Sequence, residues 1–427
     1  MKWLRVHIYL ANSFLHYSTT SSALFSFLMF VLGVLLLPFK KTKAASRLML
    51  SHRNAYSVKK QIRRERVMRR FGLFDAGVID SLVPPPDPDT PEDIFRRRII
   101  KVKEPLGKEK GVLVVSFLDS FSRICRQYDI KRILNDYFLV LELSYYGCCS
   151  PEILQYLKFA PEVITVGAVQ DYEVAFLKRL NSNLVVADFS SSAWVDHRRY
   201  YPMERDKEFD CIFVGTWDRI KRHYILLKAL KRLNDPTYKA LLVGVPWGGT
   251  RQEIENLIDH YGVRRNVTIM EKLQIPEVNE MLNRSKVKIL CTLKEGGNKA
   301  IIESMMTNTP IIVMKEHIGI KRAWINDQTG KMVGHNELPA TLDWFRTNYR
   351  TFSPRKWALE NISCLQSTVK LEQTLKQVSE RLNLPWTKSL IVKVNHGWEP
   401  VPFNSEDALT PFDFDHYRKP AGRTGVN

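Results

Sequence analysis

The sequence has few cysteines, and their spacing suits neither a disulfide scaffold nor a metal site. There are six in 427 residues, and none forms a C-x-x-C pair. So low a content excludes a small, disulfide-stapled fold. Cys148 and Cys149 are adjacent, and the other four are scattered: Cys125, Cys211, Cys291 and Cys364. We interpret all six as reduced thiols, and neither zinc binding nor redox chemistry is indicated.

Acidic residues are scarce compared with basic ones. The chain has 64 Lys or Arg and 45 Asp or Glu, a net charge of +19. Between residues 40 and 70, twelve basic residues stand beside one acid, Glu65. This segment predicts a polyanionic neighbour. Zinc fingers, aromatic RNA-binding patterns and helix-turn-helix signals are all missing, so we expect a membrane surface rather than nucleic acid.

Charge is missing from the stretch before that basic segment. Between Val6 and Phe39, only His7 and His16 can carry charge. The apolar centre, Ala23–Phe39, would span about 25 Å as a helix, and extension back to Ser18 reaches the ~30 Å of a hydrocarbon core. A cleaved signal peptide would need small residues where lysines follow the run. The alternatives are a transmembrane helix, which we predict within an anchor at residues 1–43, and a buried hydrophobic helix.

The flanking charges predict how such an anchor would be oriented. Basic residues are more numerous after the apolar run than before it, so the remainder of the chain would be cytoplasmic. Residues 44–109 would then form a basic juxtamembrane segment and a Pro-rich linker. Within it, Lys59–Arg70 would be attracted to anionic lipid. The predicted localisation is therefore a single-pass membrane protein with cytoplasmic domains.

The remainder of the chain alternates short apolar runs with helical patterns. This alternation predicts an α/β fold of two doubly wound parallel sheets, at residues 110–205 and 206–350. A C-terminal helix and a partly disordered tail would follow, at residues 351–427. Ligands of such sheets bind at the carboxyl ends of the strands. The predicted strands are Gly111–Phe117, Phe138–Leu143, Val163–Gly167, Leu184–Ala187, Cys211–Val214, Ala240–Val243, Val267–Met270, Val287–Cys291 and Pro310–Val313.

The segment Cys291–Val313 carries the clearest chemical pattern. A buried strand ends at Cys291, and a helix begins near Lys299. Glycines at such a turn let a ligand approach the backbone, and a helix N-terminus favours phosphate. Glu303, one turn into the helix, could accept hydrogen bonds from a sugar diol. The alternative is a solvated Glu303 paired with Lys299. The loop residues are Glu295, Gly296, Gly297 and Asn298.

Four segments, in order, resemble one enzyme family. Glu295–Glu303 is similar to the E-x7-E signature of the retaining glycosyltransferases called glycosyl transferases group 1, which have the GT-B fold. Val195–Pro202 resembles that family's V-D-x-x-x-F-x-P element, and Phe213–Leu230 its F-V-G-R-x-x-x-x-K-G segment. Trp324–Val333 resembles its E-D-G-x-T-G-x-L-V segment. The resemblance covers roughly residues 110–350.

The resemblance implies a role for each matching residue. Glu303 would bind the ribose hydroxyls of a nucleoside diphosphate sugar. Glu295 and the backbone N–H groups of Gly296–Lys299 would hold the transferred sugar and the diphosphate. Lys221 would neutralise the leaving diphosphate, and Gly215 would permit its close approach. No metal or other cofactor is implied, and the acceptor would be a polysaccharide or glycolipid precursor.

The sequence also departs from the family pattern. Thr216 stands where the family has arginine, and Arg222 where it has glycine. One diphosphate cation is therefore either lost or replaced by Arg219 or Arg222. Asn298 and Lys299 differ from the usual loop residues. Three alternatives therefore stay open: a non-catalytic relative that binds nucleotide sugars at a membrane, a nucleotide-sugar epimerase, and a nucleic-acid binder.

Other residues near the predicted strand ends offer fewer signals. Glu142, before Ser144–Gly147, is a candidate on the acceptor side, and Asp119 ends another strand; exposure to solvent is the alternative for Glu142. The Gly-rich segment Val245–Thr250 either lines the cleft or simply turns the chain. Three histidines lie near the motifs and receive no role: His197, His223 and His317.

Overall fold

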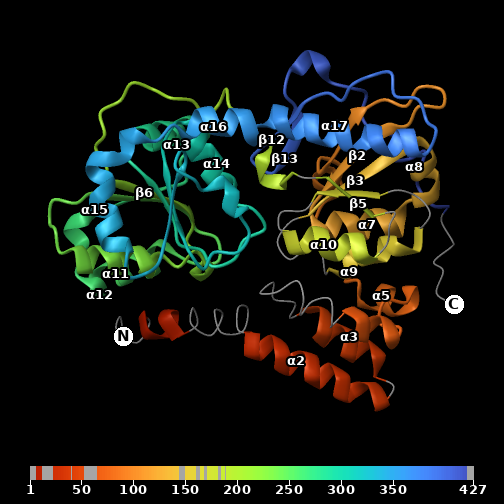
Figure 1. Cartoon of the computed structure of the whole chain (residues 1–427), viewed down its shortest axis with the longest axis horizontal. Helices are drawn as coiled ribbons and strands as arrows, with labels where there is room; N and C mark the ends of the chain where they lie inside the picture. Colours follow the sequence, from red (N-terminus) through yellow and green to blue (C-terminus); the bar gives the residue numbers. More distant parts are fainter. Residues whose placement is uncertain are drawn as a thin grey trace. The chain divides into compact units, whose positions relative to one another are not determined.

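The computed structural model of the chain describes residues 6–11, 23–39, 41–51, 65–143, 150–159, 164–167, 171–180, 184–187 and 189–420. It divides into two compact units, shown in Figure 1. The first unit comprises Met1–Thr20 and Val195–Ser363, and the second comprises Ser21–Trp194 and Cys364–Asn427. Cys148, Cys149, Ser144–Gly147 and the first half of Lys59–Arg70 lie outside the described residues.

The second unit contains a five-stranded sheet in which the strand order follows the chain. Its strands are β1 (Ile99–Lys103), β2 (Gly111–Ser116), β3 (Tyr137–Glu142), β4 (Ile164–Gly167) and β5 (Leu184–Ala187). β1 is antiparallel to β2, and the other pairs are parallel. The four predicted strands are present and β1 was not predicted. Because the order of these described strands never reverses, they do not form the doubly wound topology that we predicted for this sheet.

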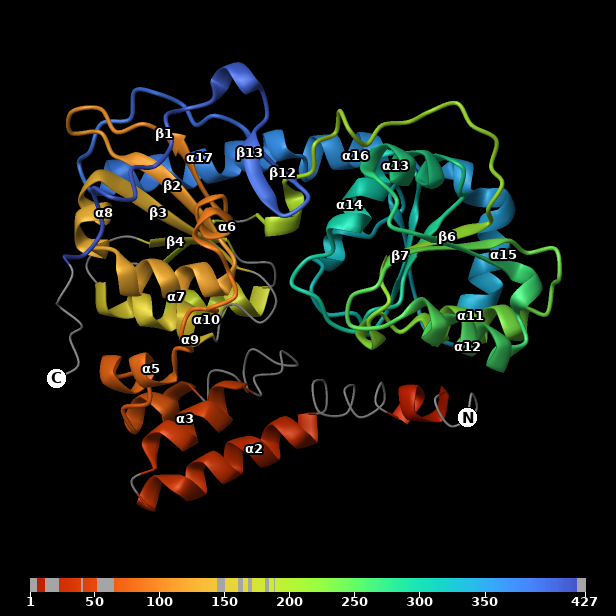
Figure 2. The same ribbon diagram turned by 180° about the vertical axis from the view of Figure 1, so that it is seen from behind.

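Both faces of this sheet are nonetheless covered, because successive strand residues point to opposite sides. Leu113 and Leu139 pack with α7–α10, whereas Val112 and Phe138 pack with α17. Figure 2 shows α7 and α10 on one side of the strands and α17 on the other. The helices are α7 (Leu118–Gln127), α8 (Ile130–Asp136), α9 (Pro151–Leu154), α10 (Asp171–Leu180) and α17 (Cys364–Arg381).

The C-terminal tail folds onto this unit as far as residue 420. It forms the hairpin of β12 (Lys393–His396) and β13 (Glu399–Pro402). Three aromatic side chains beyond the hairpin are buried in the core: Phe412, Phe414 and Tyr417. The prediction of a partly disordered tail is therefore wrong for residues 399–420, because these rings bury too much apolar surface to remain in water.

The N-terminal apolar run is broken into short helices. α2 (Ala23–Leu36) has 14 residues, followed by the short turn η1 (Leu37–Phe39) and α3 (Thr42–Ser51). Fourteen residues rise about 21 Å, short of the ~30 Å needed. None of the helices in the described part of the chain is both long and apolar enough to cross a bilayer. The predicted transmembrane anchor at residues 1–43, and the single-pass localisation based on it, are therefore wrong. Further helices of this unit are α5 (Ala76–Leu82) and α6 (Glu92–Arg96).

The first unit contains a six-stranded, all-parallel sheet whose strand order reverses. From one edge to the other the order is β11-β10-β9-β6-β7-β8. The chain starts in the middle at β6, moves outward to β8, and then returns beside β6 at β9. This is the predicted doubly wound topology, and its ligand-binding point is where β6 and β9 meet. The strands are β6 (Cys211–Thr216), β7 (Ala240–Val245), β8 (Val267–Glu271), β9 (Lys288–Leu290), β10 (Ile311–Met314) and β11 (Gly330–Val333).

Helices begin in this unit where the sequence supplies capping residues. Thr250 and Glu253 form a capping box at α12, and the side chain of Asn298 accepts a hydrogen bond at the start of α14. Residues 6–11 are helical, and Val6 and Tyr9 are buried in this unit's core. The helices are α11 (His223–Leu233), α12 (Arg251–Tyr261), α13 (Ile275–Asn283), α14 (Lys299–Met306), α15 (Leu338–Asn348) and α16 (Pro354–Asn361).

Candidate functional site

The loops that follow β6 and β9 bring a lysine and a glutamate together. Lys221 ends a short 3-10 turn (Arg219–Lys221) after β6, and Glu295 lies in the loop between β9 and α14. Lys221 Nζ is 2.6 Å from Glu295 Oε1. Their side chains retain only 16% and 11% of their exposure. The pair therefore lies at the strand reversal, where a doubly wound sheet binds its ligand.

Glu295 is held by its neighbours on both its side chain and its backbone. Asn298 Nδ2 donates to Glu295 Oε2 at 2.6 Å, while Asn298 Oδ1 accepts from Ile301 N at 3.1 Å. Glu295 N donates to the carbonyl oxygen of Ile318 at 2.9 Å. A Cβ atom on Gly319 would lie 1.7 Å from the carbonyl oxygen of Glu295. The site therefore depends on a close backbone contact that only glycine allows.

The electrostatics of Glu295 keep it ionised. Burial acts to raise its pKa, but the charge and hydrogen bond of Lys221 outweigh burial and hold the pKa below its usual value. The negative charge of Glu295 and the positive charge of Lys221 cancel, so the net charge of the pair is close to zero. A polyanionic ligand that arrived here would meet the lysine and the N-terminus of α14 rather than an isolated carboxylate.

Glu303 forms an ion pair with Lys299, but its side chain is buried rather than exposed to solvent. Lys299 Nζ is 3.6 Å from Glu303 Oε1, so the expected i,i+4 pair is present. Glu303 is nevertheless buried, and the hydroxyl of Tyr200 donates a hydrogen bond to it. Burial, and next the charge of Glu303, raise the pKa of Tyr200. Because Tyr200 lies within Val195–Pro202, two of the four family-like segments meet at this carboxylate.

Sequence reasoning missed a buried lysine beneath the site. Lys288, on β9, is 1% exposed, and its Nζ has no hydrogen-bond partner among the described residues. Burial lowers its pKa to about 8, although Glu295 and Glu303 favour its charged form. The signal was a single lysine in the otherwise apolar predicted strand Val287–Cys291. Such a residue predicts either an edge position or a buried charge, and the sheet topology decides between them.

The three histidines near the motifs have different environments. Imidazole Nδ1 of His317 is 2.7 Å from the carbonyl oxygen of Thr292, so Nδ1 carries the proton and Nε2 is an acceptor. Burial lowers the pKa of His317. His223 is fully buried between Phe213 and Trp217, and burial lowers its pKa to about 3. His197 is half-buried, with a pKa lowered mainly by burial.

The arginines that could replace the missing family cation already have carboxylate partners. Arg219 Nη2 is 2.9 Å from Glu253, and Arg222 Nη2 is 3.0 Å from Glu316. Arg222 also has a φ of 57°, in the left-handed region that glycine adopts at little cost. The left-handed backbone at residue 222 thus explains why glycine suits this position. Lys221, which pairs with Glu295, is then our candidate for the cation that stabilises the diphosphate.

Gly215 and Thr216 end β6 beside this lysine. A Cβ atom on Gly215 would lie 3.6 Å from Cδ of Lys221, an ordinary contact. The fold alone therefore does not require glycine at residue 215. Gly296 and Gly297 lie between Glu295 and Asn298, and Gly297 has a φ of 120°. Their predicted contacts with a donor remain predictions.

The Gly-rich segment Val245–Thr250 packs against the loop that follows β6. A Cβ atom on Gly249 would lie 2.2 Å from the carbonyl oxygen of Trp217, and one on Gly248 would lie 2.3 Å from Asp218. These glycines allow two loops to pack closely, and Thr250 then starts α12. Trp247 is 77% exposed.

Glu142, the acceptor-side candidate, belongs to the second unit and is buried there. Its side chain accepts from Ser116 Oγ at 2.7 Å and lies 3.1 Å from Lys393 Nζ. Both members of this ion pair are 1% exposed. The interpretation of Glu142 as a solvent-exposed carboxylate is wrong. Asp119 forms an ion pair with Arg98.

Part of the first unit matches a known protein family in sequence. Residues 202–344 match the family Glycosyl transferases group 1. A curated relative is 24% identical over 247 residues, which cover 56% of this chain and 65% of the relative. It is the GalNAc-alpha-(1->4)-GalNAc-alpha-(1->3)-diNAcBac-PP-undecaprenol alpha-1,4-N-acetyl-D-galactosaminyltransferase of Campylobacter jejuni. The match thus spans less than two thirds of that relative's length.

Among solved structures, sucrose-phosphate synthase from Thermosynechococcus elongatus is similar in fold. It is 16% identical with a TM-score of 0.50, and the match covers 63% of this chain and 74% of that one. This likeness concerns the fold alone. Residues 202–344 of the first unit match the glycosyl transferases group 1 family, and the parallel sheet with its strand reversal agrees with an α/β fold of the GT-B type.

Proposed function

We propose that the chain is a glycosyltransferase that moves a sugar from a nucleoside diphosphate sugar to a carbohydrate or lipid-linked acceptor. The observation that carries the proposal is the Lys221–Glu295 pair, 2.6 Å between Nζ and Oε1, at the strand reversal of a group 1 domain. We propose that the donor binds beside Gly215, Thr216 and the glycines of the loop before α14.

The proposed chemistry relies on positive charge where the diphosphate leaves. As the bond to the sugar breaks, charge develops on the diphosphate. Lys221 and the N-terminus of α14 stabilise that charge without a resident metal. Backbone N–H groups of residues 296–299 add hydrogen bonds. The carboxylate of Glu303, which lies beside Tyr200 and Lys299, would accept hydrogen bonds from the ribose hydroxyls. We propose that the transfer retains the anomeric configuration.

The acceptor is proposed from the curated relative. The name of that relative describes transfer to a glycan on undecaprenyl diphosphate. We therefore propose a lipid-linked glycan as the acceptor, with the sugar and the base of the donor left to experiment. Glu142 is not part of this proposal, because Lys393 and Ser116 already occupy its carboxylate.

One observation favours a second candidate, a relative that binds nucleotide sugars without transferring them. Thr216 replaces the family arginine, and Arg219 and Arg222 are engaged with Glu253 and Glu316. A domain with one cation fewer would stabilise the leaving diphosphate less.

The test measures release of nucleoside diphosphate from UDP-, GDP- and ADP-sugars, with and without an undecaprenyl-diphosphate-linked glycan. We expect release with one donor base, stimulated by the acceptor and lost in Lys221→Ala. The matched control is Lys228→Ala, since Lys228 is an exposed lysine on α11 of the same unit. Donor binding without release under all conditions would favour the non-catalytic candidate.

A further inference from the structure

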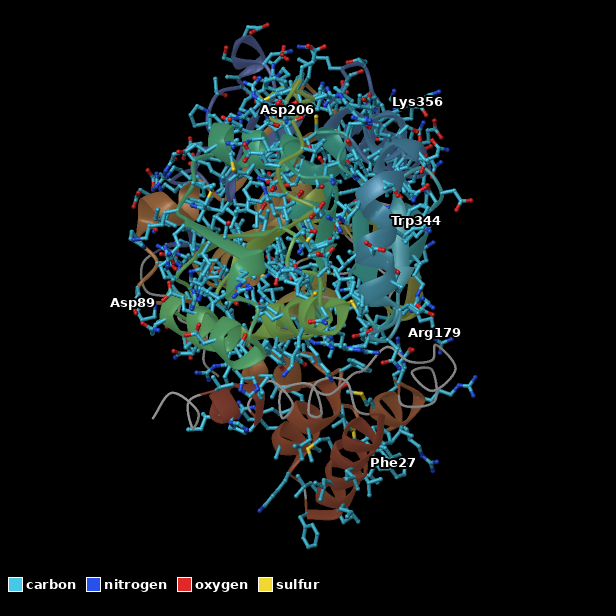
Figure 3. All side chains as sticks on the ribbon, turned by 90° about the vertical axis from the view of Figure 1, so that its left-hand side faces the viewer. Phe27, Asp89, Arg179, Asp206, Trp344 and Lys356 are labelled. Atoms are coloured by element: carbon cyan, nitrogen blue, oxygen red, sulfur yellow. The ribbon has the colours of Figure 1, made fainter. Side chains whose placement is uncertain are left out.

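Helix α2 is apolar on both of its faces, and the described residues cover one of them. Phe30, Val34 and Leu37, the last on the turn just after α2, pack against the core of the second unit. The opposite side exposes large apolar side chains: Phe27 (55%), Leu28 (47%), Leu32 (45%), Leu35 (59%) and, on the same turn, Phe39 (73%). Figure 3 labels Phe27 on this helix. We call these five residues the outer face of α2.

This outer face is unlike the surface of an ordinary helix in water. A surface helix places charged or polar residues opposite its buried stripe. In α2 the one polar residue is Ser26, and charged residues are missing from its sequence ALFSFLMFVLGVLL. Contiguous exposed apolar patches of this kind mark interaction surfaces. We therefore expect an apolar partner to cover the outer face of α2.

The neighbouring helix α3 supplies positive charge beside the apolar face. α2 and α3 pack side by side, and a Cβ atom on Gly33 would lie 2.8 Å from Met49 Cγ. α3 buries Ala45 and Met49, and it exposes Lys43 and Arg47. Basic side chains on α3 beside the apolar face of α2 give one surface both features that a bilayer interface attracts, where acyl chains meet anionic headgroups.

The first 74 residues of the chain, which include α2 and α3, are strongly basic. Glu65 is the one acidic residue among the first 74 of the sequence. It is 2% exposed and pairs with Arg69 at 3.1 Å and Arg179 at 2.9 Å. The charge of Glu65 is thus neutralised by two arginines. Several basic residues remain exposed: Lys41, Lys43, Arg47, Arg66 and Arg70.

We propose that the outer face of α2 and the adjacent basic residues form a docking surface for an anionic lipid bilayer. The helix lies along the membrane and not across it, since Phe30, Val34 and Leu37 hold its other side on the protein core. Its phenylalanines and leucines enter the boundary between headgroups and acyl chains, and the lysines and arginines contact lipid phosphates. The proposal does not depend on the glycosyltransferase activity.

A second copy of the chain fits this surface less well. A symmetric dimer would place the same patch on both sides of the interface. Exposed lysines and arginines of one copy would then face their own counterparts on the other, and like charges across an interface oppose association. An anionic bilayer offers both an apolar interior and negative charge, and it matches both halves of the surface.

The experiment is vesicle sedimentation of the full chain. The vesicles contain either phosphatidylcholine alone or about 30% phosphatidylglycerol, which gives them a negative surface. The test variant is Leu28→Glu with Leu32→Glu. The matched control is Leu365→Glu with Val369→Glu on α17, at the same i,i+4 spacing and with exposures of 40% and 46%. A third variant replaces Lys41, Lys43 and Arg47 by serine.

We expect the wild type and the α17 control to sediment with the anionic vesicles. The α2 variant should bind at least about tenfold more weakly, and the serine variant should lose its preference for anionic lipid. Circular dichroism and melting temperature confirm that each variant is folded. Equal binding by the α2 variant and the control would overturn the proposal, as would a wild type that ignores both vesicle types. A concentration-dependent dimer that the α2 substitutions abolish, without vesicle binding, would assign the surface to a second copy instead.

Discussion

Lys221 and Glu295 share a hydrogen bond of 2.6 Å although 74 residues separate them in the chain. β6 and β9, the strands that precede them, are neighbours in the sheet. The residue proposed to stabilise the diphosphate is therefore held in place by the residue proposed to hold the sugar. A donor bound here would place its diphosphate beside a lysine whose position is already fixed, which lowers the cost of organising the site.

Replacement of Lys221 by alanine should reduce turnover by more than about tenfold, or ~1.4 kcal/mol of transition-state stabilisation. It removes the cation and leaves Glu295 as a buried, unpaired carboxylate. Steady-state rates of nucleoside diphosphate release measure the effect. Lys228→Ala should retain the wild-type rate, and equal rates for both variants would remove Lys221 from the mechanism.

Replacement of Gly319 by alanine should disrupt the site through the backbone. The new Cβ would lie 1.7 Å from the carbonyl oxygen of Glu295, and the φ of Gly319 is 131°. We expect a loss of more than about 2 kcal/mol in the free energy of unfolding, measured with urea. Gly262→Ala is the matched control: its φ is 70°, but no atom lies within 4 Å of the new Cβ. It should cost only about 1 kcal/mol. Similar losses in both variants would show that backbone conformation, and not the contact with Glu295, dominates.

Acid should destabilise the first unit through His223. Burial lowers its pKa in the folded state to about 3, below the 6.5 of a free histidine. The folded state thus binds fewer protons than the unfolded state between these values. The contribution of neutral His223 to the free energy of unfolding is fully present above pH 6.5. It is lost as the pH falls toward 3, and the loss amounts to up to about 5 kcal/mol. In His223→Leu the unfolding free energy should fall less steeply over this range. His416→Leu, at an exposed histidine, is the control and should keep the wild-type pH dependence. If the unfolding free energy of His223→Leu fell as steeply with pH as that of the wild type, His223 would not be the cause.

Lys288 should make the protein less stable at neutral pH than an uncharged side chain would. Its pKa falls from 10.5 to about 8 on folding, so the folded state binds fewer protons between these values. Its contribution to stability therefore rises with pH from 8 to 10.5. Lys288→Met should raise the unfolding free energy at pH 7 by about 3 kcal/mol, with the gain shrinking above pH 8. The exposed Lys239→Met should show no such gain. A destabilised Lys288→Met variant would mean that Glu295 and Glu303 depend on this cation.

The sequence predicted the parts of the fold that repeat a local pattern. The strand ends before Lys221 and Glu295 follow from apolar runs, and strand reversal in a parallel sheet then brings them together. The partner of Glu142 could not be predicted, because Lys393 lies 251 residues away on a hairpin in the tail. The end of α2 was also missed. Its apolar run continues to Phe39, but the chain turns at residues 37–39 and α3 packs back on the helix. Composition alone does not distinguish a face that packs on protein from a face that meets lipid.

The central claim is that the group 1 domain binds a nucleoside diphosphate at Glu303 and the loop before α14. The most direct measurement is the melting temperature of the full chain with UDP, GDP and ADP, for the wild type, Glu303→Ala and the exposed control Glu360→Ala. A ligand that binds only the folded state raises the midpoint by mass action. We predict a rise with one nucleotide in the wild type and in Glu360→Ala, and none in Glu303→Ala. The absence of any rise in the wild type, or a rise that persists in Glu303→Ala, would contradict the account.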